Sequence, residues 1–409
     1  MASVGSASVV SEARTEPRVG ATLAMLAAAG FLVSLDRAIF APLLPALARD
    51  LDATISAVGL AVTAYVLPYG GFQLVFGPVA DRTGKVRVVR LALALFAVGT
   101  GLCGLATSLA LLDALRFLTG AAAAAVIPLS LAFIGDAVPY ERRQAAIANF
   151  MSATSLGNAL STAVGGVVGQ VLSWRALFAF YGVGALVVTA AMVRLASDPP
   201  KAPDAPLPPG GWTATWSRYA RVLAVDRARF LYCVVLLEGV VVQGAFTYLG
   251  AYLEARFALA YLWIGLLLAC YGIGTLATSR VVRRVRARIG EPGLVLIGGV
   301  LIGGGYLAVS PTPVWWLVAL PVLVMGIGFT LFHTTLQTAA TELVPELRGT
   351  AVSLFGFSLF LGAGAGTAGL GVLLDRAGFT ALLLVSGGLM LGLTAVTWRH
   401  WRARAAGRV

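Results

Sequence analysis

The 409-residue chain is 59% hydrophobic and 12% charged, with a net charge of +12 and a mean hydropathy of +0.88. Soluble domains carry about 25% charged residues, so this composition excludes a soluble protein with a water-facing surface of its own size. Lipid is the solvent that suits so apolar a chain. The basic residues lie in short runs between apolar segments and not on one polar module, so they do not predict a nucleic-acid partner.

Apolar stretches long enough to cross a ~30 Å hydrocarbon layer as helices recur along the whole chain. Residues 1–18 precede them and predict a cytoplasmic tail, because they include charged side chains and lack the apolar core of a signal peptide. The sequence therefore predicts an all-α integral membrane protein with 12 transmembrane helices. In chain order, the expected spans are 19–47, 55–80, 86–107, 109–135, 143–171, 175–196, 228–254, 260–281, 292–310, 314–340, 350–374 and 378–399.

Lys and Arg residues predict the orientation, because short cytoplasmic loops are enriched in them. Most of the 30 Lys and Arg residues lie in the termini and in the loops on the same side as the termini, for example 82–90 and 280–288. We therefore expect a multi-pass protein of the cell (inner) membrane with both termini in the cytoplasm.

A polar segment that is rich in proline interrupts the apolar pattern at residues 197–227, as expected of a cytoplasmic linker. It separates an N-terminal bundle of six helices (19–196) from a C-terminal bundle of six (228–399), and residues 400–409 form a cytoplasmic tail. Within the linker, the stretch from Trp212 to Val225 mixes aromatic and basic residues. It predicts either a short amphipathic helix on the cytoplasmic membrane surface or an irregular connection.

The two halves repeat each other when the chain is shifted by 206 residues. The segment VGLAVTAY then aligns with IGLLLACY, so that Tyr65 matches Tyr271, and DAVPYERRQA aligns with ELVPELRGTA. The same offset places Gly120 on Gly326. One constant offset that serves several separate segments indicates duplicated halves, with a substrate site between them near the membrane midplane.

The segment GPVADRTGKVR, which starts at Gly77, resembles motif A of the major facilitator superfamily, with a valine where a second adjacent basic residue is usual. Glycine permits close helix approach and tight turns, and Asp81 can face a helix N-terminus or an arginine. The resemblance implies a conformational latch that closes the cytoplasmic side in the outward-open state. Its residues are Gly77, Asp81, Arg82, Gly84 and Lys85.

Two further segments resemble the 12-helix drug:proton antiporter family of this superfamily. LRFLTGAAAA, with the intramembrane Arg116, is similar to motif B, and SLDRAIFAPLLPAL is similar to the first-helix signature. The fifth span departs from antiporter motif C, because it has Gly157 and Gly165-Gly166 but lacks the Gly-Pro pair. With the repeat, the resemblance covers nearly the whole chain and implies the major facilitator fold of two pseudo-symmetric six-helix bundles.

Ionisable side chains within membrane spans cost roughly 2.5–3.5 kcal/mol each, so each needs a partner, a wet cavity or a use. Asp36 lies in the outer part of the first span beside Arg37, but adjacent residues of a helix point to different faces. We expect Asp36 to face the central cavity and to bind a proton or a cationic substrate; the alternative is a structural ion pair with an arginine elsewhere. Glu238, followed by Gln243, lies near mid-depth in the seventh span and is either a proton carrier or a hydrogen-bonded structural carboxyl group.

Asp113 and Arg116 share a helix face, so a local ion pair is one interpretation of Arg116. The resemblance to motif B implies the other, in which Arg116 takes part in proton release from a nearby carboxylate. His333 and Gln337, near the inner end of the tenth span, are either hydrogen-bonded fillers or site residues. We assign proton coupling to Asp36, Glu238 and Arg116. The predicted substrate cavity contains Asp36, Arg37, Glu238, Gln243 and His333.

These features predict a secondary active transporter and not an enzyme, since the sequence offers no catalytic triad, metal-ligand cluster or phosphate-binding loop. The leading prediction is proton-coupled efflux of small amphipathic organic compounds by alternating access. The alternatives are a proton symporter or facilitator that imports a metabolite, and a non-transporting membrane sensor or scaffold. We expect a small-molecule substrate, protons and the lipid bilayer as partners, no cofactor or metal, and a monomer.

Overall fold

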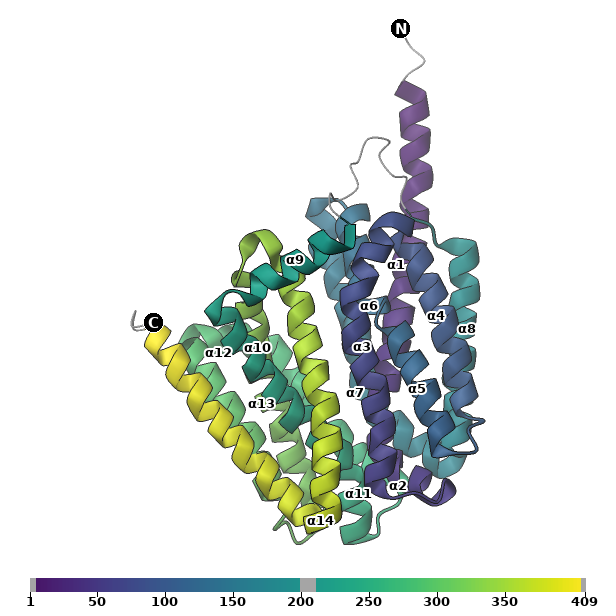
Figure 1. Cartoon of the computed structure of the whole chain (residues 1–409). Coiled ribbons are helices and arrows are strands. Elements are labelled where there is room, and N and C mark those ends of the chain that lie inside the picture. Colours follow the sequence, from purple (N-terminus) through teal and green to yellow (C-terminus); the bar gives the residue numbers. More distant parts are fainter. Residues whose placement is uncertain (1–4, 199–210, 406–409) are drawn as a thin grey trace.

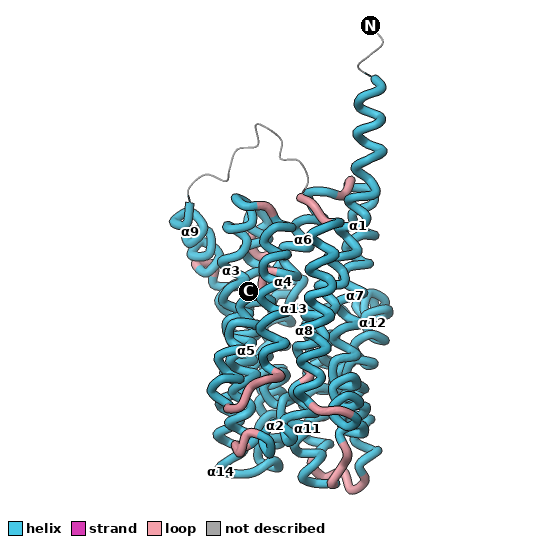
Figure 2. The backbone as a smooth tube through the Cα atoms, turned by 90° about the vertical axis from the view of Figure 1, so that its right-hand side faces the viewer, coloured by secondary structure: helices cyan, strands magenta, loops and turns pink. Residues whose placement is uncertain are grey.

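The structure, a computed structural model, describes residues 5–198 and 211–405. Helices follow one another through short connections in these residues, and strands are absent from them (Figure 1; Figure 2). The prediction of an all-helical chain is therefore confirmed. The elements are α1 (Gly5–Arg37), α2 (Phe40–Asp50), α3 (Ile55–Thr83), α4 (Lys85–Cys103), α5 (Leu109–Ala123), α6 (Val126–Ala137), α7 (Tyr140–Val171), α8 (Trp174–Leu195), α9 (Gly211–Leu223), α10 (Asp226–Glu238), the π-helix η1 (Gly239–Gly244), α11 (Ala245–Phe257), α12 (Tyr261–Val309), η2 (Trp315–Val318), α13 (Ala319–Glu342), η3 (Pro345–Leu347) and α14 (Arg348–Ala405).

Nine helices in the described part of the chain are long and apolar enough to cross a membrane. Two of them, α12 and α14, are interrupted by a glycine with positive φ, Gly290 at 67° and Gly378 at 77°. Each of these glycines lies where one predicted span gives way to the next, and Figure 1 shows α14 turning back on itself. The 32-residue α7, at the predicted span 143–171, is not among the nine. The count of 12 transmembrane helices stays a prediction.

Proline explains why two predicted spans are divided in the structure. A proline removes the hydrogen bond to the carbonyl group four residues earlier, and its ring clashes with that group. The position four residues before Pro42 is Ala38, where α1 gives way to α2, and the position four residues before Pro128 is Ala124, where α5 gives way to α6. The seventh predicted span is also irregular, since η1 separates α10 from α11.

The internal repeat recurs in the packing of both halves. A Cβ atom on Gly120 would lie 2.8 Å from the carbonyl carbon of Tyr65, and one on Gly326 would lie 2.8 Å from that of Tyr271. Both distances are too short for any side chain, so each glycine allows the same close helix contact. The four residues are the pairs that the 206-residue offset brings together, so the duplicated sequence folds into duplicated contacts.

Elements from the two halves of the chain lie on different sides of the molecule, α1 to α8 on one and α10 to α14 on the other (Figure 1). The halves meet where α3 packs along α14 and α7 packs along α12. We name the end that carries α9 and the turn at Gly84 the linker end, and the end that carries α2 and the C-terminus of α11 the distal end.

The helix α9 confirms the first of the two expectations for the linker, a short helix. The Tyr219 hydroxyl donates a hydrogen bond of 3.3 Å to the carbonyl oxygen of Leu74 in α3, and α9 also packs against α10 and α14. This helix therefore contacts both halves.

The predicted tails and linker lie partly outside the described residues, namely at residues 1–4, 199–210 and 406–409. Helix α1 begins at Gly5, inside the predicted tail 1–18, and α14 continues to Ala405, inside the predicted tail 400–409. The predicted domain limits 19–196, 197–227 and 228–399 stay predictions.

Candidate functional site

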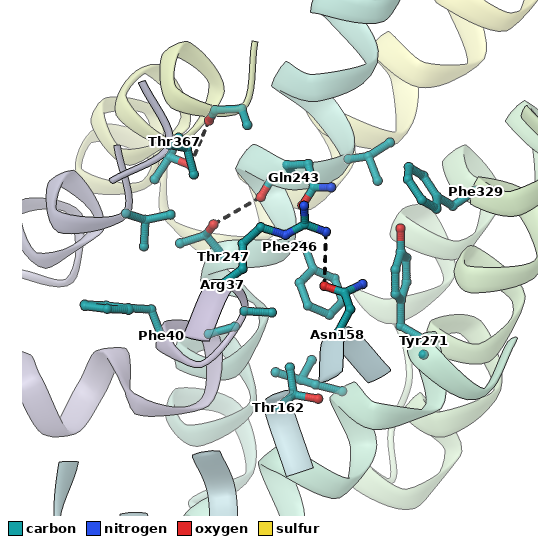
Figure 3. Close-up of a pocket in the computed structure, with 18 of the residues that line it drawn as sticks. Arg37, Phe40, Asn158, Thr162, Gln243, Phe246, Thr247, Tyr271, Phe329 and Thr367 are labelled. Carbon is teal, nitrogen blue, oxygen red and sulfur yellow. Dashed lines mark hydrogen bonds between the residues drawn. The ribbon is translucent and has the colours of Figure 1, made fainter. Parts of the chain in front are cut away.

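A cavity of about 80 Å³ lies between the two halves (Figure 3). Arg37 and Asn158 line it from the first half, and Gln243, Tyr271 and Phe329 line it from the second. The walls thus combine a guanidinium group, amides, hydroxyl groups and aromatic rings. A mainly apolar hollow with a few converging polar groups is typical of a small-molecule site.

The break between α1 and α2 places Arg37 in this cavity. Its Nη2 donates a hydrogen bond of 3.1 Å to Oδ1 of Asn158 on α7. The backbone groups that the break releases are satisfied by Ser161, whose hydroxyl accepts from the Ala38 amide at 3.2 Å and donates to the Leu35 carbonyl oxygen at 2.5 Å. A buried backbone group without a partner is costly, so Ser161 stabilises the turn between α1 and α2 that presents Arg37.

The second half presents Gln243 from an equivalent position. The 206-residue offset places Gln243 on Arg37, and both side chains line the same cavity in Figure 3. Gln243 lies in η1, whose glycines approach α14 closely: a Cβ atom on Gly244 would lie 2.7 Å from the carbonyl carbon of Gly366. Broken or irregular helices beside the central site are typical of secondary transporters.

The structure gives Asp36 the arrangement that the sequence analysis left open as an alternative, an ion pair with an arginine on another helix. Asp36 does not line the cavity; its carboxylate accepts a hydrogen bond of 2.8 Å from Nη1 of Arg116, and the two side chains are 0% and 1% exposed. Adjacent residues leave a helix in different directions, which is why Arg37 enters the cavity while Asp36 turns into the first half. The partner that the structure gives Arg116 is Asp36 and not Asp113.

Aromatic rings surround this buried ion pair. The guanidinium carbon of Arg116 lies 4.0 Å from the ring centroid of Tyr65 and 4.8 Å from that of Phe40. Asp36 Oδ1 and the Tyr65 hydroxyl have no hydrogen-bond partner among the described residues. One oxygen of this carboxylate therefore bonds Arg116, and the other remains without a hydrogen-bond donor among the described residues.

A second pair, formed by a buried carboxyl group and a partly buried histidine, lies in the other half, where the sequence predicted Glu238 and His333 separately. Nδ1 of His333 on α13 lies 3.1 Å from Oε1 of Glu238 at the end of α10, and Glu238 is 0% exposed. Neither side chain lines the cavity, but the His333 ring stacks on Phe329, which does, at 4.6 Å between centroids. Gln337 is exposed on α13 and lies outside this cluster.

The residues of the motif A segment gather at the linker end. Gly84 has φ of 100°, which only glycine adopts readily, and the turn exposes the amides of Val86 and Arg87 to the Asp198 carboxylate at 2.8 and 3.2 Å. Asp198 thereby satisfies free amide groups at the N-terminus of α4 and complements its dipole. Lys85 forms ion pairs with Asp136 and, at 3.9 Å, with Asp81.

A cleft of about 980 Å³ lies at the linker end. Gly77, Asp81 and Arg82 line it from the first half, and Arg348 and Ser353 line it from the second. The segment predicted to form a latch thus borders a hollow between the halves.

The distal end, in contrast, is held together by contacts between the halves. Arg49 forms an ion pair of 2.9 Å with Glu254, and the Ser56 hydroxyl donates to Asp375 at 2.6 Å. Backbones also meet there, because a Cβ atom on Gly250 would lie 2.7 Å from the carbonyl carbon of Ala41. The molecule is therefore hollow at the linker end and closed at the distal end.

Several of these residues were missed by the sequence reasoning, notably Asn158, Ser161 and Asp198. A signal existed for Ser161, since Ser161 and Thr162 stand where motif C has its Gly-Pro pair. Asp198 directly follows the sixth predicted span, and its role depends on a turn more than 100 positions earlier. In residues 5–198 and 211–405, no group of three or more His, Cys, Asp or Glu side chains is arranged to hold a metal ion.

This geometry defines a class of protein: a helical membrane protein whose site is shared by two repeated halves. The model of the Major Facilitator Superfamily matches residues 26–367 and 263–407, so the chain belongs to that superfamily.

Curated relatives with similar sequences include transporters from bacteria. The chain is 28% identical over 369 residues to the uncharacterized MFS-type transporter YceJ of Bacillus subtilis (strain 168), a match that covers 87% of this chain and 91% of the relative. It is 26% identical over 349 residues to a chloramphenicol resistance protein of Pseudomonas aeruginosa, covering 82% of this chain and 80% of the relative.

Solved structures share the fold. The nucleoside transporter NupG superposes with a TM-score of 0.75 at 16% identity, covering 93% of this chain and 98% of that one. A bacterial homolog of the human lysosomal transporter Spinster, in an inward-facing and unoccupied conformation, superposes with a TM-score of 0.75 at 17% identity, covering 93% and 95%. At these identities the likeness extends to the fold alone.

Proposed function

We propose that this chain is a proton-coupled exporter of small amphipathic organic compounds that works by alternating access. The observation that supports this most directly is a cavity lined by both halves, with a buried ion pair directly behind one wall. The chloramphenicol resistance protein among the relatives supports export as the direction. The basic loops support a cytoplasmic linker end, cytoplasmic termini and an inner-membrane location.

In this proposal the twelve predicted spans form two six-helix bundles that rock against each other. The structure then corresponds to the inward-facing state, with the cleft at the linker end open to the cytoplasm and the distal contacts closed. The motif A latch would form when the cleft closes and Asp81 approaches the N-terminus of α14, whose dipole attracts negative charge.

Asp36 and Arg116 are proposed to carry the proton coupling. Protonation of Asp36 would remove the negative charge that holds the Arg116 guanidinium, and a buried cation without a counter-charge is strongly unfavourable. The first half would then repack around Arg116, and the turn at Ala38 would transmit the change to Arg37 in the cavity. Glu238 and His333 form a second titratable pair, which Phe329 connects to the opposite wall.

The test uses purified protein in liposomes with an imposed pH gradient and a panel that includes chloramphenicol. Substrate-dependent proton movement opposite to the substrate supports the exporter, movement in the same direction indicates a symporter, and no movement with any compound favours the sensor. The variant Asp36→Asn is expected to lose gradient-driven transport while the protein remains folded. Asp113→Asn is the matched control, because it removes another intramembrane carboxylate outside the ion pair; unchanged coupling in Asp36→Asn would remove Asp36 from the mechanism.

A further inference from the structure

We propose that the transported compounds are aromatic molecules with an anionic or strongly hydrogen-bond-accepting oxygen group, and that the site rejects organic cations. This inference rests on the proposed transport function and specifies its substrate class.

The first argument for this substrate class is the positive charge of the cavity. Arg37 is the one charged side chain among the described residues that line it. The adjacent Asp36 is fully buried and bonded to Arg116, and Glu238 is fully buried beside His333. Carboxylates are therefore present near the cavity but turned away from it, so a ligand at this site meets a positive charge.

The second argument is that Arg37 has hydrogen-bond donors left for a ligand. A guanidinium group has five N–H donors, and the described residues accept from it at one point, Oδ1 of Asn158. Its carbon also lies 5.6 Å from the ring centroid of Phe360. The remaining donors can bind an oxygen group of a ligand, which a carboxylate satisfies in two-point geometry.

The opposite wall defines the remainder of the ligand. Phe246, Tyr271 and Phe329 supply aromatic faces from three helices of the second half, and Gln243 adds an amide. Aromatic rings pack favourably against such faces in offset or edge-to-face arrangements. The chemistry of the lining residues fits an aromatic ring whose acceptor group points toward Arg37.

An organic cation would be disfavoured at this site for the same reason. It would share the cavity with the Arg37 guanidinium, and no carboxylate among the described lining residues would offset the repulsion. Like charges within a few ångströms repel each other, and the repulsion is stronger near a protein than in bulk water. The Phe360 ring already lies against the Arg37 guanidinium, so its cation–π attraction is not free for a ligand cation.

Binding of three compounds that share a naphthalene ring tests the charge preference. The probes are 2-naphthoate, its neutral methyl ester, and naphthalene with a trimethylammonium-methyl group, titrated calorimetrically into the full chain in lipid nanodiscs. We expect the carboxylate to bind at least about tenfold more tightly than the cation, with the ester in between. Equal or tighter binding of the cation would overturn the inference.

Variants of one residue locate the effect. Arg37→Gln is expected to bring the anion-to-cation affinity ratio close to one, and Arg37→Lys to preserve the preference with weaker binding of the carboxylate. Asn158→Ala is the matched control, because it removes the contact of Arg37 but leaves its charge. A preference that survives Arg37→Gln would show that another group sets it and would overturn the inference.

The same preparation separates this inference from the proposed function. If the cationic probe binds and moves across liposome membranes, transport stands and the substrate class is wrong. If no probe binds and no compound of the transport panel moves, the proposed function fails and the inference fails with it.

Discussion

Gly250 offers a direct way to test whether the distal contacts hold the molecule in its observed state. This glycine lies in α11 against the backbone of Ala41 and Pro42, where the halves meet. Replacement by alanine adds a single methyl group in the middle of that contact. Because alanine favours helices more than glycine does, any loss of closure must come from the contact and not from weaker helix formation.

The required movement follows from the geometry. A Cβ atom on Gly250 would lie 2.7 Å from the Ala41 carbonyl carbon and 3.0 Å from the Pro42 Cα. Backbone atoms cannot rotate away, so α2 and α11 must separate by roughly 1 Å, and such overpacking typically costs about 1–3 kcal/mol. The strain exists only while the distal end is closed. Gly250→Ala should therefore shift the equilibrium toward a state open at the distal end by about 5–150-fold.

Cysteine labelling measures this shift. In a background without native cysteines, Ser353→Cys at the open cleft should react with a bulky maleimide, and Gly250→Ala should slow that reaction. Gly71→Ala is the control, because no atom lies within 4 Å of its added Cβ. Gly166→Ala is a second, independent wedge, since its Cβ would lie 2.8 Å from the Gly265 Cα of the other half.

One result would refute the reasoning. If Gly250→Ala and Gly166→Ala are both folded, as judged by gel filtration and thermal unfolding, and the labelling rate equals that of the control, the close backbone contacts do not determine which end is open.

Three further predictions concern the ion pairs and the cap of α4. Arg116→Met leaves Asp36 buried without its partner and should cost about 3–5 kcal/mol, whereas Asp36→Leu/Arg116→Met should recover most of the loss; thermal unfolding in detergent measures both, and additive losses would contradict the pairing. Glu238→Gln keeps a polar partner for His333 and should lower stability less than Glu238→Leu; the reverse order would exclude a stabilising contact. Asp198→Ala should cost about 0.5–2 kcal/mol and Asp198→Asn less, and equal losses would show that the carboxylate does not cap α4.

Local features of the fold could be predicted from the sequence because they depend on nearby residues. The turn at Gly84 and the interruption at Gly290 follow from glycine positions in duplicated segments, and both glycines have positive φ. Pro42 and Pro128 likewise indicate breaks in their helices, but the sequence analysis treated both spans as unbroken helices. The π-helix η1 contains no proline, and it lies where α14 approaches closely, a contact between distant segments that sequence periodicity does not reveal.

The candidate site was predictable only in part, because its pairs join distant segments. Asp36 and Arg116 are 80 positions apart, and Glu238 and His333 are 95 apart. The spacing of three residues along one helix suggested Asp113 as the partner of Arg116. That spacing carries no information about a partner on another helix. The scarcity of charged residues in the spans singled out Asp36, Arg116 and Glu238. The direction in which Asp36 points could not be predicted, because it depends on where α1 ends.

The difference between Arg37 and Gln243 has a consequence for how a ligand can lie. Duplication of one ancestral half would give two identical walls, across which a molecule could bind in either of two opposite senses with equal energy. With a cation on one wall and a neutral amide at the matching position on the other, these two senses are no longer equivalent. If the cavity binds substrate as proposed, one orientation of an asymmetric compound should be favoured, and regioisomers of the same size, charge and hydrophobicity should bind with different affinities.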